Sequence, residues 1–441
     1  MPDHDREYDI VLWGATGFTG RLVADYLADR YGASDLDWAL AGRSRERLAA
    51  VRDEVAAGER GGDAGRDDGD RDAADRDDGL ADLPLLVGDA FDRGSLDAIA
   101  ERAAVVCTTV GPYATYGTEL VAACVAHGTD YCDLSGEVHW MRQTIDEHHE
   151  RARETGARIV HGCGFDSVPS DIGTLLLQTH AEETLGSPCE EVRGLVSIRG
   201  GAFSGGTIAS MVELYETADE DREVRRILAD PRPLDPPESR DAPADRPQRW
   251  VGYDRDLDTW TAPFVMAQIN EPVVSRSNAL LEHPWGHAFR YGEALATGDG
   301  VGGAVRAGAL ALGQGLLAGA LSIGPLRRAL DRYVFPDPGD GPDEETIEDS
   351  SFAVRLRGTG ASDDHPGGFA VEATVRGDRD PGYGSTCRML GESAVCLARG
   401  DVESPYDGGV LTPASGIGLP LIDRLEGTGV AFDVETVERG D

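Results

Sequence analysis

The sequence predicts an α/β protein in which an N-terminal doubly wound parallel sheet is followed by a second α+β domain. In the first part, short apolar runs alternate with helical patterns, an order typical of parallel strands joined by helices. The first apolar run, Asp9–Trp13, leads directly into a glycine-rich turn. Farther along, Phe352–Arg357 and Phe369–Val375 alternate apolar and polar residues, which indicates an antiparallel sheet. At 441 residues the chain exceeds a typical single core, so two domains are expected.

Each element of the first domain follows from this alternation. The expected strands are Asp9–Trp13, Asp37–Ala41, Leu83–Val87, Val105–Thr109, Thr129–Cys132 and Arg158–His161. The expected helices between them are Arg21–Arg30, Arg45–Ala57, Ser95–Arg102, Thr118–His127 and His139–Thr155. Because a helical stretch separates each strand from the next, the strands are expected to run parallel.

Two polar tracts interrupt the pattern. Gly58–Gly79 contains only charged residues, glycine and alanine, so it cannot contribute to a core and is expected to be a disordered acidic insertion. Asp230–Arg249 is rich in Pro, Asp and Arg and is expected to form a long loop in the second domain. Toward the end of the chain, Ser385–Arg399 and Pro413–Leu425 are each expected to form a helix.

The glycine-rich turn is typical of a dinucleotide site. Gly14 and Gly17 keep the turn free of Cβ atoms, so that a phosphate can approach the main chain, and Gly20 lets the next helix pack against the strand. That helix, for which Thr19 is the expected cap, would offer unpaired N–H groups and the positive end of its dipole to a pyrophosphate. The alternative is a turn with a structural role alone.

Arg43 indicates which dinucleotide would bind. It follows Gly20 at about the distance where NAD-binding proteins place the carboxylate that binds the ribose 2′-hydroxyl. A guanidinium there matches a 2′-phosphate instead, so the predicted cofactor is NADP. The residues expected to contact it are Gly14, Thr16, Gly17, Phe18, Thr19, Gly20, Arg43, Ser44, Asp89, Thr109, Gly111 and Pro112.

The charge of the chain excludes one class of partner. There are 80 acidic residues against 41 basic ones, for a net charge of −39, and every basic residue is arginine. Such a surface suits a salt-rich cytosol, where screening suppresses self-repulsion, so a halophilic protein is expected. With no basic stripe to neutralise phosphates, nucleic acid is not an expected partner.

The cysteines and the N-terminus indicate a cytoplasmic protein. The seven cysteines form no C-x-x-C pair and are expected to be reduced and mostly buried. The first residues are charged and include no apolar run that could serve as a signal peptide. His161 and Cys163 are too few for a metal site, so no metal is expected.

One uncharged stretch of twenty residues, Ala307–Leu326, lies between Arg306 and Arg327. It is near the length needed to span a bilayer. It is also rich in Gly and Ala and contains the spacing Gly315-x-x-x-Gly319, which a buried or dimer-forming helix explains as well as lipid does. The favoured interpretation is a buried helix, followed by contact with a membrane surface and then by a true membrane span.

In open α/β sheets, ligands bind beyond the carboxyl ends of the strands. The loops that follow the last three expected strands are Thr109–Tyr113, Asp133–Glu137 and Cys163–Asp171. These loops are rich in glycine, proline and polar residues and are expected to face the nicotinamide. Asp89, after the third strand, is expected near the adenine end.

Several motifs together resemble a known family. They are Gly14–Gly20, Ala41–Arg43, Gly111–Tyr113, Asp133–Glu137, Gly164–Asp171, Ser204–Thr207, Asp380–Gly384 and Gly408–Ala414. The chain resembles the saccharopine dehydrogenase-like oxidoreductases, and within them it is most similar to the trans-acting enoyl reductase branch. The insertion Gly58–Gly79 is not part of that family pattern.

The resemblance implies a division of the chain and an activity. It implies a Rossmann domain at 1–166, an α+β substrate and dimerisation domain at 167–411, and a final segment, 412–441, that returns to the first domain. It also implies a place in lipid metabolism, because enoyl reductases of this branch use NADPH to reduce a carbon–carbon double bond in a lipid or polyketide chain. The expected substrate is therefore a small apolar molecule, such as an acyl or isoprenoid chain.

Two other functions stay open. A saccharopine-type amino acid dehydrogenase acts on a C–N bond and needs several cations for its charged substrate, to which Arg199, Arg290 and Arg388 could contribute. A dinucleotide-binding protein without turnover could act at a lipid surface, and exposure of Ala307–Leu326 would favour it.

A reduction also needs a proton donor within hydrogen-bond reach of the substrate. The candidates are Tyr113, Asp166, Ser167 and Tyr383. Each has a structural alternative: Tyr113 could flank the nicotinamide, Asp166 and Ser167 could cap the next helix, and Tyr383 could lie in a simple turn. The active site is expected between the domains, with Tyr113 and Asp166 side by side.

Overall fold

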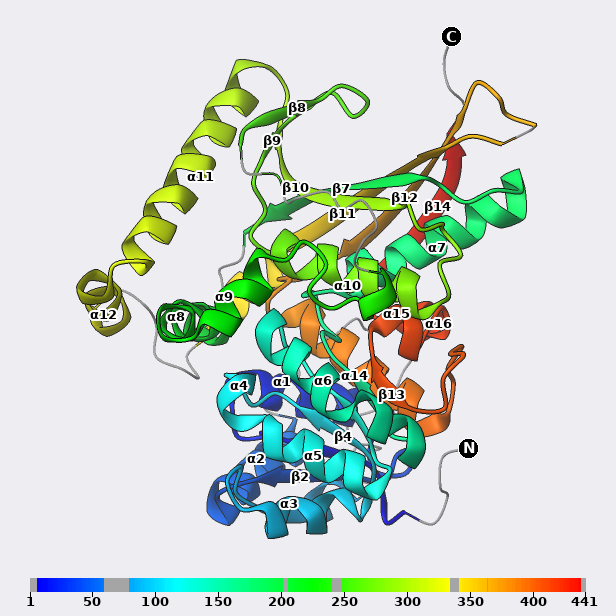
Figure 1. Ribbon diagram of the computed structural model, residues 1–441. Coiled ribbons are helices and arrows are strands. Elements are labelled where there is room, and N and C mark those ends of the chain that lie inside the picture. The colour runs from blue at the N-terminus through cyan, green and yellow to red at the C-terminus, as the bar shows by residue number, and fades with distance from the viewer. Residues whose placement is uncertain are drawn as a thin grey trace.

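The computed structural model describes residues 6–58, 79–200, 205–239, 248, 250–333, 341–362 and 364–437. The chain forms two seven-stranded sheets in two stacked units (Figure 1). The expected α/β class, with a doubly wound sheet and a second α+β unit, is confirmed. Apart from its two end residues, the expected insertion Gly58–Gly79 lies outside the described residues, as does most of the second half of Asp230–Arg249.

The first sheet is parallel throughout, with the strand order β13-β6-β5-β4-β1-β2-β3. Its strands are β1 (Tyr8–Trp13), β2 (Trp38–Gly42), β3 (Leu85–Val87), β4 (Ala103–Thr108), β5 (Asp130–Cys132), β6 (Arg158–Val160) and β13 (Gly409–Leu411). Its connecting helices are α1 (Phe18–Tyr31), α2 (Arg45–Ala57), α3 (Arg93–Ala100), α4 (Tyr113–Tyr116), α5 (Thr118–His127) and α6 (Val138–Thr155). The strand order reverses between β1 and β4, which is where doubly wound sheets bind their ligands.

The burial of β1 explains its sequence. Ile10, Val11 and Leu12 are fully buried, because helices cover both faces of the sheet. A strand of this kind is apolar throughout instead of alternating. The helix after β2 has clear ends: Ser44 caps α2 at its start, and Gly58 adopts the left-handed conformation at its end.

The second sheet is mixed, with the order β14-β12-β11-β7-β10-β9-β8. Its strands are β7 (Glu191–Arg199), β8 (Gly252–Asp254), β9 (Thr259–Ala262), β10 (Arg290–Gly298), β11 (Ser351–Gly360), β12 (Phe369–Gly377) and β14 (Val430–Val437). The expected antiparallel pairing holds except between β7 and β10, which run parallel. A long connection that contains several helices joins these two strands, and parallel pairing requires such a crossover.

The helices of this unit lie mainly beneath the sheet, between it and the first unit (Figure 1). Two of them, α7 (Val168–Leu185) and α10 (Ala267–Leu280), pack against the strands and against each other. The remaining helices are α8 (Gly205–Glu220), α9 (Arg222–Ala229), α11 (Gly300–Leu321), α12 (Gly324–Tyr333) and α13 (Glu344–Glu348), with a 3-10 turn at Pro237–Ser239; another 3-10 turn, Leu80–Asp82, precedes β3 in the first unit.

The C-terminal part of the chain departs from expectation. The return to the first unit begins with α14 (Gly384–Arg399), which packs on α1 and on β1, β4 and β5, and continues with β13 beside β6. The last strand, β14, then pairs with β12 of the second sheet. The division at 411/412 is therefore wrong. Helix α14 is buried on every side from Gly384 to Ala398, which requires cover from both units, and β14 supplies the hydrogen bonds that the edge of β12 would otherwise lack.

The expected helix Pro413–Leu425 is two short helices, α15 (Pro413–Gly416) and α16 (Pro420–Leu425). Gly418, with φ +81°, and Pro420 break the helix between them.

The expected buried helix at Ala307–Leu326 is wrong as well. Helix α11 projects from the body at one edge of the molecule (Figure 1), and Gly303, Ala307 and Leu321 are its only buried residues. By length and composition it could cross a membrane, and no other helix in the described ranges could. All seven cysteines, by contrast, are free and buried, as expected.

Candidate functional site

The glycine-rich loop between β1 and α1 is shaped so that main chain alone can fit. Gly14 has φ +92°, and a Cβ at this position would lie 2.5 Å from Val110 Cγ2. A Cβ on Gly20 would lie 2.2 Å from the Gly14 oxygen. A Cβ on Gly17 would meet only the Gly14 oxygen, at 3.4 Å, so this glycine leaves an open cradle beside the turn.

Helix α1 begins at Phe18, with Gly17 in the capping position and no side chain bonded to its first N–H groups. Thr19 is therefore not the cap, contrary to expectation. The Gly17 N–H binds the Gly14 oxygen at 2.9 Å, a turn so tight that the helix starts before Thr19 is reached. The uncapped first turn, together with the cradle at Gly17, fits the pyrophosphate of a dinucleotide.

Arg43 follows the end of β2, where its side chain is exposed and forms no ion pair within the described part of the chain. A cation held there without a carboxylate fits a 2′-phosphate. Ser44 Oγ accepts the Arg47 N–H at 3.3 Å, so this residue also shapes the start of α2. Asp89, in the loop after β3, accepts the Phe91 N–H at 2.9 Å.

The loop after β4 contacts the glycine-rich loop directly. Thr109 Oγ1 donates a hydrogen bond to the Gly14 oxygen at 3.4 Å. Gly111, which follows, is exposed, and Pro112 leads into α4. The loops that follow the neighbouring strands β1 and β4 therefore lie against each other, while Thr16 Oγ1 lies on the β2 side, 3.9 Å from where a Cβ on Gly42 would be.

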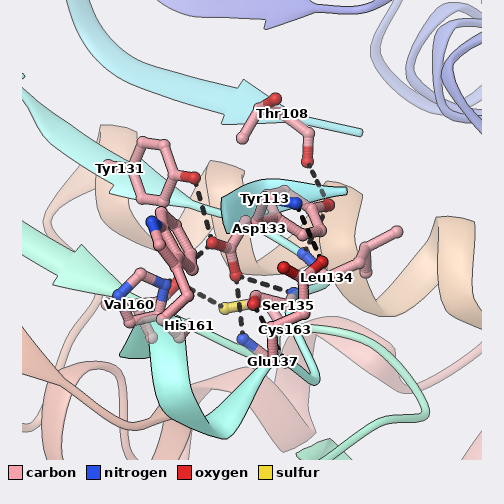
Figure 2. A network of polar contacts seen from close by, with 12 residues as sticks. Thr108, Tyr113, Tyr131, Asp133, Leu134, Ser135, Glu137, Val160, His161 and Cys163 are labelled. Atoms are coloured by element: carbon pink, nitrogen blue, oxygen red, sulfur yellow. Dashed lines mark hydrogen bonds and ion pairs between the residues drawn. The ribbon is translucent and has the colours of Figure 1, made fainter. Parts of the chain in front are cut away.

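Glu137 anchors the start of α4 (Figure 2). Its two carboxylate oxygens accept the N–H groups of Tyr113 and Ala114, each at 2.8 Å. The Tyr113 hydroxyl donates to the Thr108 oxygen at 3.4 Å and accepts the Leu134 N–H at 3.1 Å. Tyr113 is buried, and its hydroxyl proton is held by main chain. This tyrosine therefore ties the loops after β4 and β5 together.

Asp133 organises the next layer of the site (Figure 2). It is fully buried and accepts the Tyr131 hydroxyl at 2.9 Å, the Ser135 N–H at 3.0 Å and the Gly162 N–H at 3.1 Å, and it lies 2.8 Å from His161 Nδ1. Sequence reasoning did not assign roles to Asp133, Glu137 or His161. The available signal was their position, because each follows a parallel strand at the edge where the loops converge.

Asp166 lies in the loop between β6 and α7. Its Oδ1 is 3.8 Å from where a Cβ on Gly136 would be, and Ile269 of α10 borders the same spot. Burial by the surrounding protein raises the pKa of the Asp166 carboxyl to about 7, and the charge of Asp133 acts in the same direction. The negative charge of Asp166 in turn helps raise the pKa of the Tyr113 phenol, which burial already raises. The two residues therefore lie within electrostatic reach of each other.

Ser167 is fully buried, and its hydroxyl is 3.2 Å from Asn270 Oδ1. Asn270 Nδ2 then donates to Glu293 at 2.9 Å. Ser167 occupies the capping position of α7, but its side chain makes no capping bond. It belongs to a buried polar chain that joins α7, α10 and β10.

Tyr383 immediately precedes α14, and its ring packs edge-on against Phe18, with centroids 4.8 Å apart. One turn later, Thr386 Oγ1 accepts the Phe165 N–H at 3.0 Å. The start of α14 therefore lies between the glycine-rich loop and the Phe165–Asp166 loop. Of the four predicted donors, the structure brings Tyr113, Asp166 and Tyr383 to this convergence. The Ser167 hydroxyl instead contacts Asn270 in the buried core.

Comparison with known proteins identifies the family. A protein of Mycobacterium tuberculosis named as a trans-acting enoyl reductase is 41% identical, and the alignment covers 97% of each chain. A trans-acting enoyl reductase of Mycobacterium bovis is 38% identical over 98% of this chain and 99% of its own. The chain belongs to the saccharopine dehydrogenase-like oxidoreductases, in the trans-acting enoyl reductase branch. Saccharopine dehydrogenase (L-Glu forming) from Saccharomyces cerevisiae shares the fold, with a TM-score of 0.52 and 13% identity over 97% of this chain and 99% of that one.

The first unit matches the family model described as the saccharopine dehydrogenase NADP-binding domain over residues 10–160. This range begins in β1 and ends with β6, so it contains the glycine-rich loop, Arg43 and Glu137. The chain is accordingly an NADP-dependent oxidoreductase, and the open cradle and the exposed Arg43 fit that cofactor.

The three arginines considered for a charged amino acid substrate do not lie together in the described part of the chain. Arg290 pairs with Glu191 at 2.5 Å on the second sheet, and Arg388 pairs with Asp378 at 2.5 Å. Arg199 is the last residue of β7 and is exposed. None of the three lies in the loops around Asp166.

Proposed function

We propose that this protein is an NADPH-dependent enoyl reductase, which reduces a carbon–carbon double bond in an apolar acyl, isoprenoid or polyketide-like chain. The names of the relatives support the reaction class. The seven reduced, buried cysteines support a cytoplasmic enzyme.

Asp166 carries the proposal, because it combines the right place with the right proton affinity. A carboxyl with a pKa of about 7 is half protonated near neutral pH, which suits a general acid. The Tyr113 hydroxyl is committed to the Thr108 oxygen, and Ser167 is bound within the core. Among the predicted donors, Asp166 is therefore the one best suited to act as the general acid.

When bound, NADPH would supply a hydride to one alkene carbon. Asp166 donates its carboxyl proton to the neighbouring carbon, so that both alkene carbons are saturated, and it recovers a proton from water. The loops that hold Asp166 keep their geometry through main-chain bonds: Glu137 fixes the start of α4, and Asp133 fixes the two loops on either side. The reacting groups are thus oriented before the substrate arrives.

Apolar side chains next to Asp166 support an apolar substrate. Ile269 borders it from α10, and the neighbouring Phe165 packs edge-on against Phe352, with ring centroids 4.8 Å apart. An amino acid substrate would bring fixed charges beside these groups. Two of the three candidate arginines, Arg290 and Arg388, pair with carboxylates elsewhere, so the geometry favours the enoyl reductase over a C–N dehydrogenase.

The test is NADPH oxidation by the purified protein with a series of trans-2-enoyl thioesters of increasing chain length. Asp166→Asn is expected to lower turnover by roughly a hundredfold or more while NADPH affinity stays unchanged. Asp130→Asn is the matched control. Asp130 is also buried with a pKa raised to about 6, but it lies at the start of β5, away from these loops.

Two results would contradict the proposal. If no enoyl thioester of any length accelerates NADPH oxidation while NADPH still binds, the reaction class is wrong. If Asp166→Asn retains full turnover, the reaction stands but Asp166 is not the acid, and Tyr383 becomes the next residue to substitute.

A further inference from the structure

Helix α11 carries a stripe of large aliphatic side chains on its outer face. The stripe consists of Val301, Val305, Leu312 and Leu316 of α11 together with Ile323, two residues beyond the end of the helix, and these side chains are between 55% and 82% exposed. Their spacing places them on one side of the helix. The buried residues Gly303, Ala307 and Leu321 lie on the opposite side, where the helix packs on β9 and β10. The apolar stripe therefore faces away from the protein.

The rest of the exposed perimeter of α11 is equally free of acidic groups. The chain contains 80 acidic residues, yet none occurs between Asp299 and Asp331. Most of the other exposed positions are Gly or Ala, and a Cβ on Gly308, Gly315 or Gly319 would meet nothing within 4 Å. A helix in water normally carries charge on its outer face. The only charged residue of α11 is Arg306, and the absence of charge from the aliphatic stripe indicates that something apolar covers the stripe.

Two exposed arginines lie close to the stripe in the sequence: Arg306 follows Val305 in α11, and Arg328 lies in α12. Arg306 donates to the Thr297 oxygen at 3.1 Å and Arg328 to the Gly324 oxygen at 3.4 Å. Neither forms an ion pair within the ranges that the structure describes, whereas the buried Arg327 beside them binds Asp219 at 2.9 Å. In a chain of net charge −39, this local positive charge complements an anionic partner.

Aromatic side chains extend the surface at one end. Trp250 is 81% exposed and Tyr253 is 43% exposed, and both belong to the segment that forms β8. Strand β8 pairs with β9, the strand that α11 packs against, and the β8–β9 hairpin lies near the N-terminal end of α11 (Figure 1). Trp and Tyr are enriched where proteins meet the polar–apolar boundary of a membrane.

A second copy of the chain is a poorer occupant than lipid. A helix of 22 residues is about 33 Å long and roughly 10 Å across, so a seam between two copies of α11 would bury on the order of 600 Å² in total, about half of what a stable dimer needs. A seam of this kind would also bring the arginines of one copy toward those of the other. Anionic headgroups avoid both problems.

We propose that α11 is a docking helix that lies in the surface of an anionic phospholipid bilayer. The aliphatic stripe enters the boundary between headgroups and acyl chains, and Arg306 and Arg328 contact the phosphates. This surface is independent of the proposed reductase reaction, since none of its residues lies at the convergence around Asp166.

The experiment is flotation of the full chain with vesicles of phosphatidylglycerol and phosphatidylcholine in equal parts, compared with pure phosphatidylcholine vesicles. The wild-type protein is expected to float with the anionic vesicles. Leu316→Asp is expected to weaken this partition roughly tenfold or more, because an inserted leucine is replaced by a charge. Leu228→Asp is the matched control, since Leu228 is an exposed leucine on α9 outside the stripe.

Arg328→Gln tests the electrostatic part without altering the stripe. It is expected to weaken binding to the anionic vesicles roughly fivefold and to leave any binding to phosphatidylcholine unchanged. NADPH affinity should be that of the wild type in all three variants, which shows that they are folded.

The proposal is overturned if the wild-type protein fails to float, or if Leu316→Asp floats as well as Leu228→Asp. It is also overturned if sedimentation velocity shows a dimer that Leu316→Asp dissociates while no vesicle binding occurs. In that case the stripe joins two copies of the chain.

Discussion

The glycine-rich side of the site is shaped by main chain, whereas the Asp166 side is shaped by side chains. Around Gly14 and Gly20, the shape comes from main chain and from the absence of side chains. Around Asp166, it comes from carboxylates and amides delivered by separate segments, such as Glu137 before α6 and Asn270 in α10. In our proposal, the first side binds a pyrophosphate, a group common to many ligands, while the second orients the groups of one particular reaction.

The difference explains which of the two sides is visible in a sequence. A main-chain cradle needs glycine at fixed spacing within a few residues, so the pattern is local. A side-chain site needs contacts between distant segments. Asp166 obtains its raised pKa from its surroundings, including Asp133, and no spacing in the sequence records those surroundings.

The largest effect is expected from Gly20→Ala, which tests the main-chain side of this comparison. The new Cβ would lie 2.2 Å from the Gly14 oxygen and 2.9 Å from Ala15 Cα, and backbone atoms cannot yield as a flexible side chain can. We expect NADPH affinity to fall on the order of a hundredfold, through the loss of two charge-assisted main-chain bonds, and stability to fall by about 3 kcal/mol. Calorimetric titration and urea unfolding measure the two effects.

Gly313→Ala is the control for that substitution. Gly313 also lies within a helix, but a Cβ there would meet nothing within 4 Å. The change should raise stability by about 0.5–1 kcal/mol through helix propensity and leave NADPH binding alone. Equal effects of the two substitutions would show that the loop around Gly14 adapts to a Cβ on residue 20. The proposal that the shape of the main-chain cradle determines NADPH affinity would then be wrong.

Much of the fold was predictable because its signals are local. Helices α2 and α5 were predicted with the bounds that the structure shows, and the parallel order followed from the alternation of strands and helices. The start of α1 was missed because Gly17 takes the cap that Thr19 was expected to supply. A tight turn and a threonine cap are both consistent with the same letters, and only the backbone distinguishes them.

The positions of α14, β14 and α11 were not predictable for a different reason. The apolar spacing of α14 predicts a helix but cannot show which sheet it covers, and β14 was free to join either sheet. The uncharged stretch Ala307–Leu326, most of which lies in α11, has the same sequence whether protein or lipid surrounds it. In each case the missing information concerns a partner distant in the sequence or absent from it.

The second prediction concerns the Asp166 side and the dependence of stability on pH. Burial raises the pKa of Asp166 from its ordinary 3.8 to about 7, so between these values the folded chain holds a proton that the unfolded chain releases. The stabilisation is therefore complete below about pH 4 and is lost as the pH rises through about 7. Asp166→Asn removes this loss and should be more stable than the wild type above about pH 8, by about 2 kcal/mol after allowance for partial exposure of Asp166.

Urea unfolding of both proteins at about pH 5 and about pH 8 measures this difference directly. Asp171, whose pKa burial also raises to about 7, is present in both proteins and cancels in the comparison. A wild type as stable as the variant at the higher pH would mean that Asp166 is solvated and ionised. The proposal that Asp166 is the general acid would then be wrong, although the proposed cofactor site would be unaffected.

The smallest effect is expected from Arg43→Ala, which adds a side-chain contact to the comparison because Arg43 is the one cationic side chain predicted to bind the cofactor. We expect the main-chain cradle to hold the pyrophosphate of NADPH and NADH equally, so that the difference between them rests on the 2′-phosphate. Loss of one charge-assisted contact of about 1.5–3 kcal/mol should weaken NADPH binding about tenfold or more and leave NADH binding nearly unchanged.

Arg45→Ala is the control, since Arg45 is an exposed arginine two residues farther along, at the start of α2. If titration shows that Arg45→Ala weakens NADPH binding as much as Arg43→Ala does, the selectivity comes from the general positive charge of this loop and not from one guanidinium placed at the end of β2.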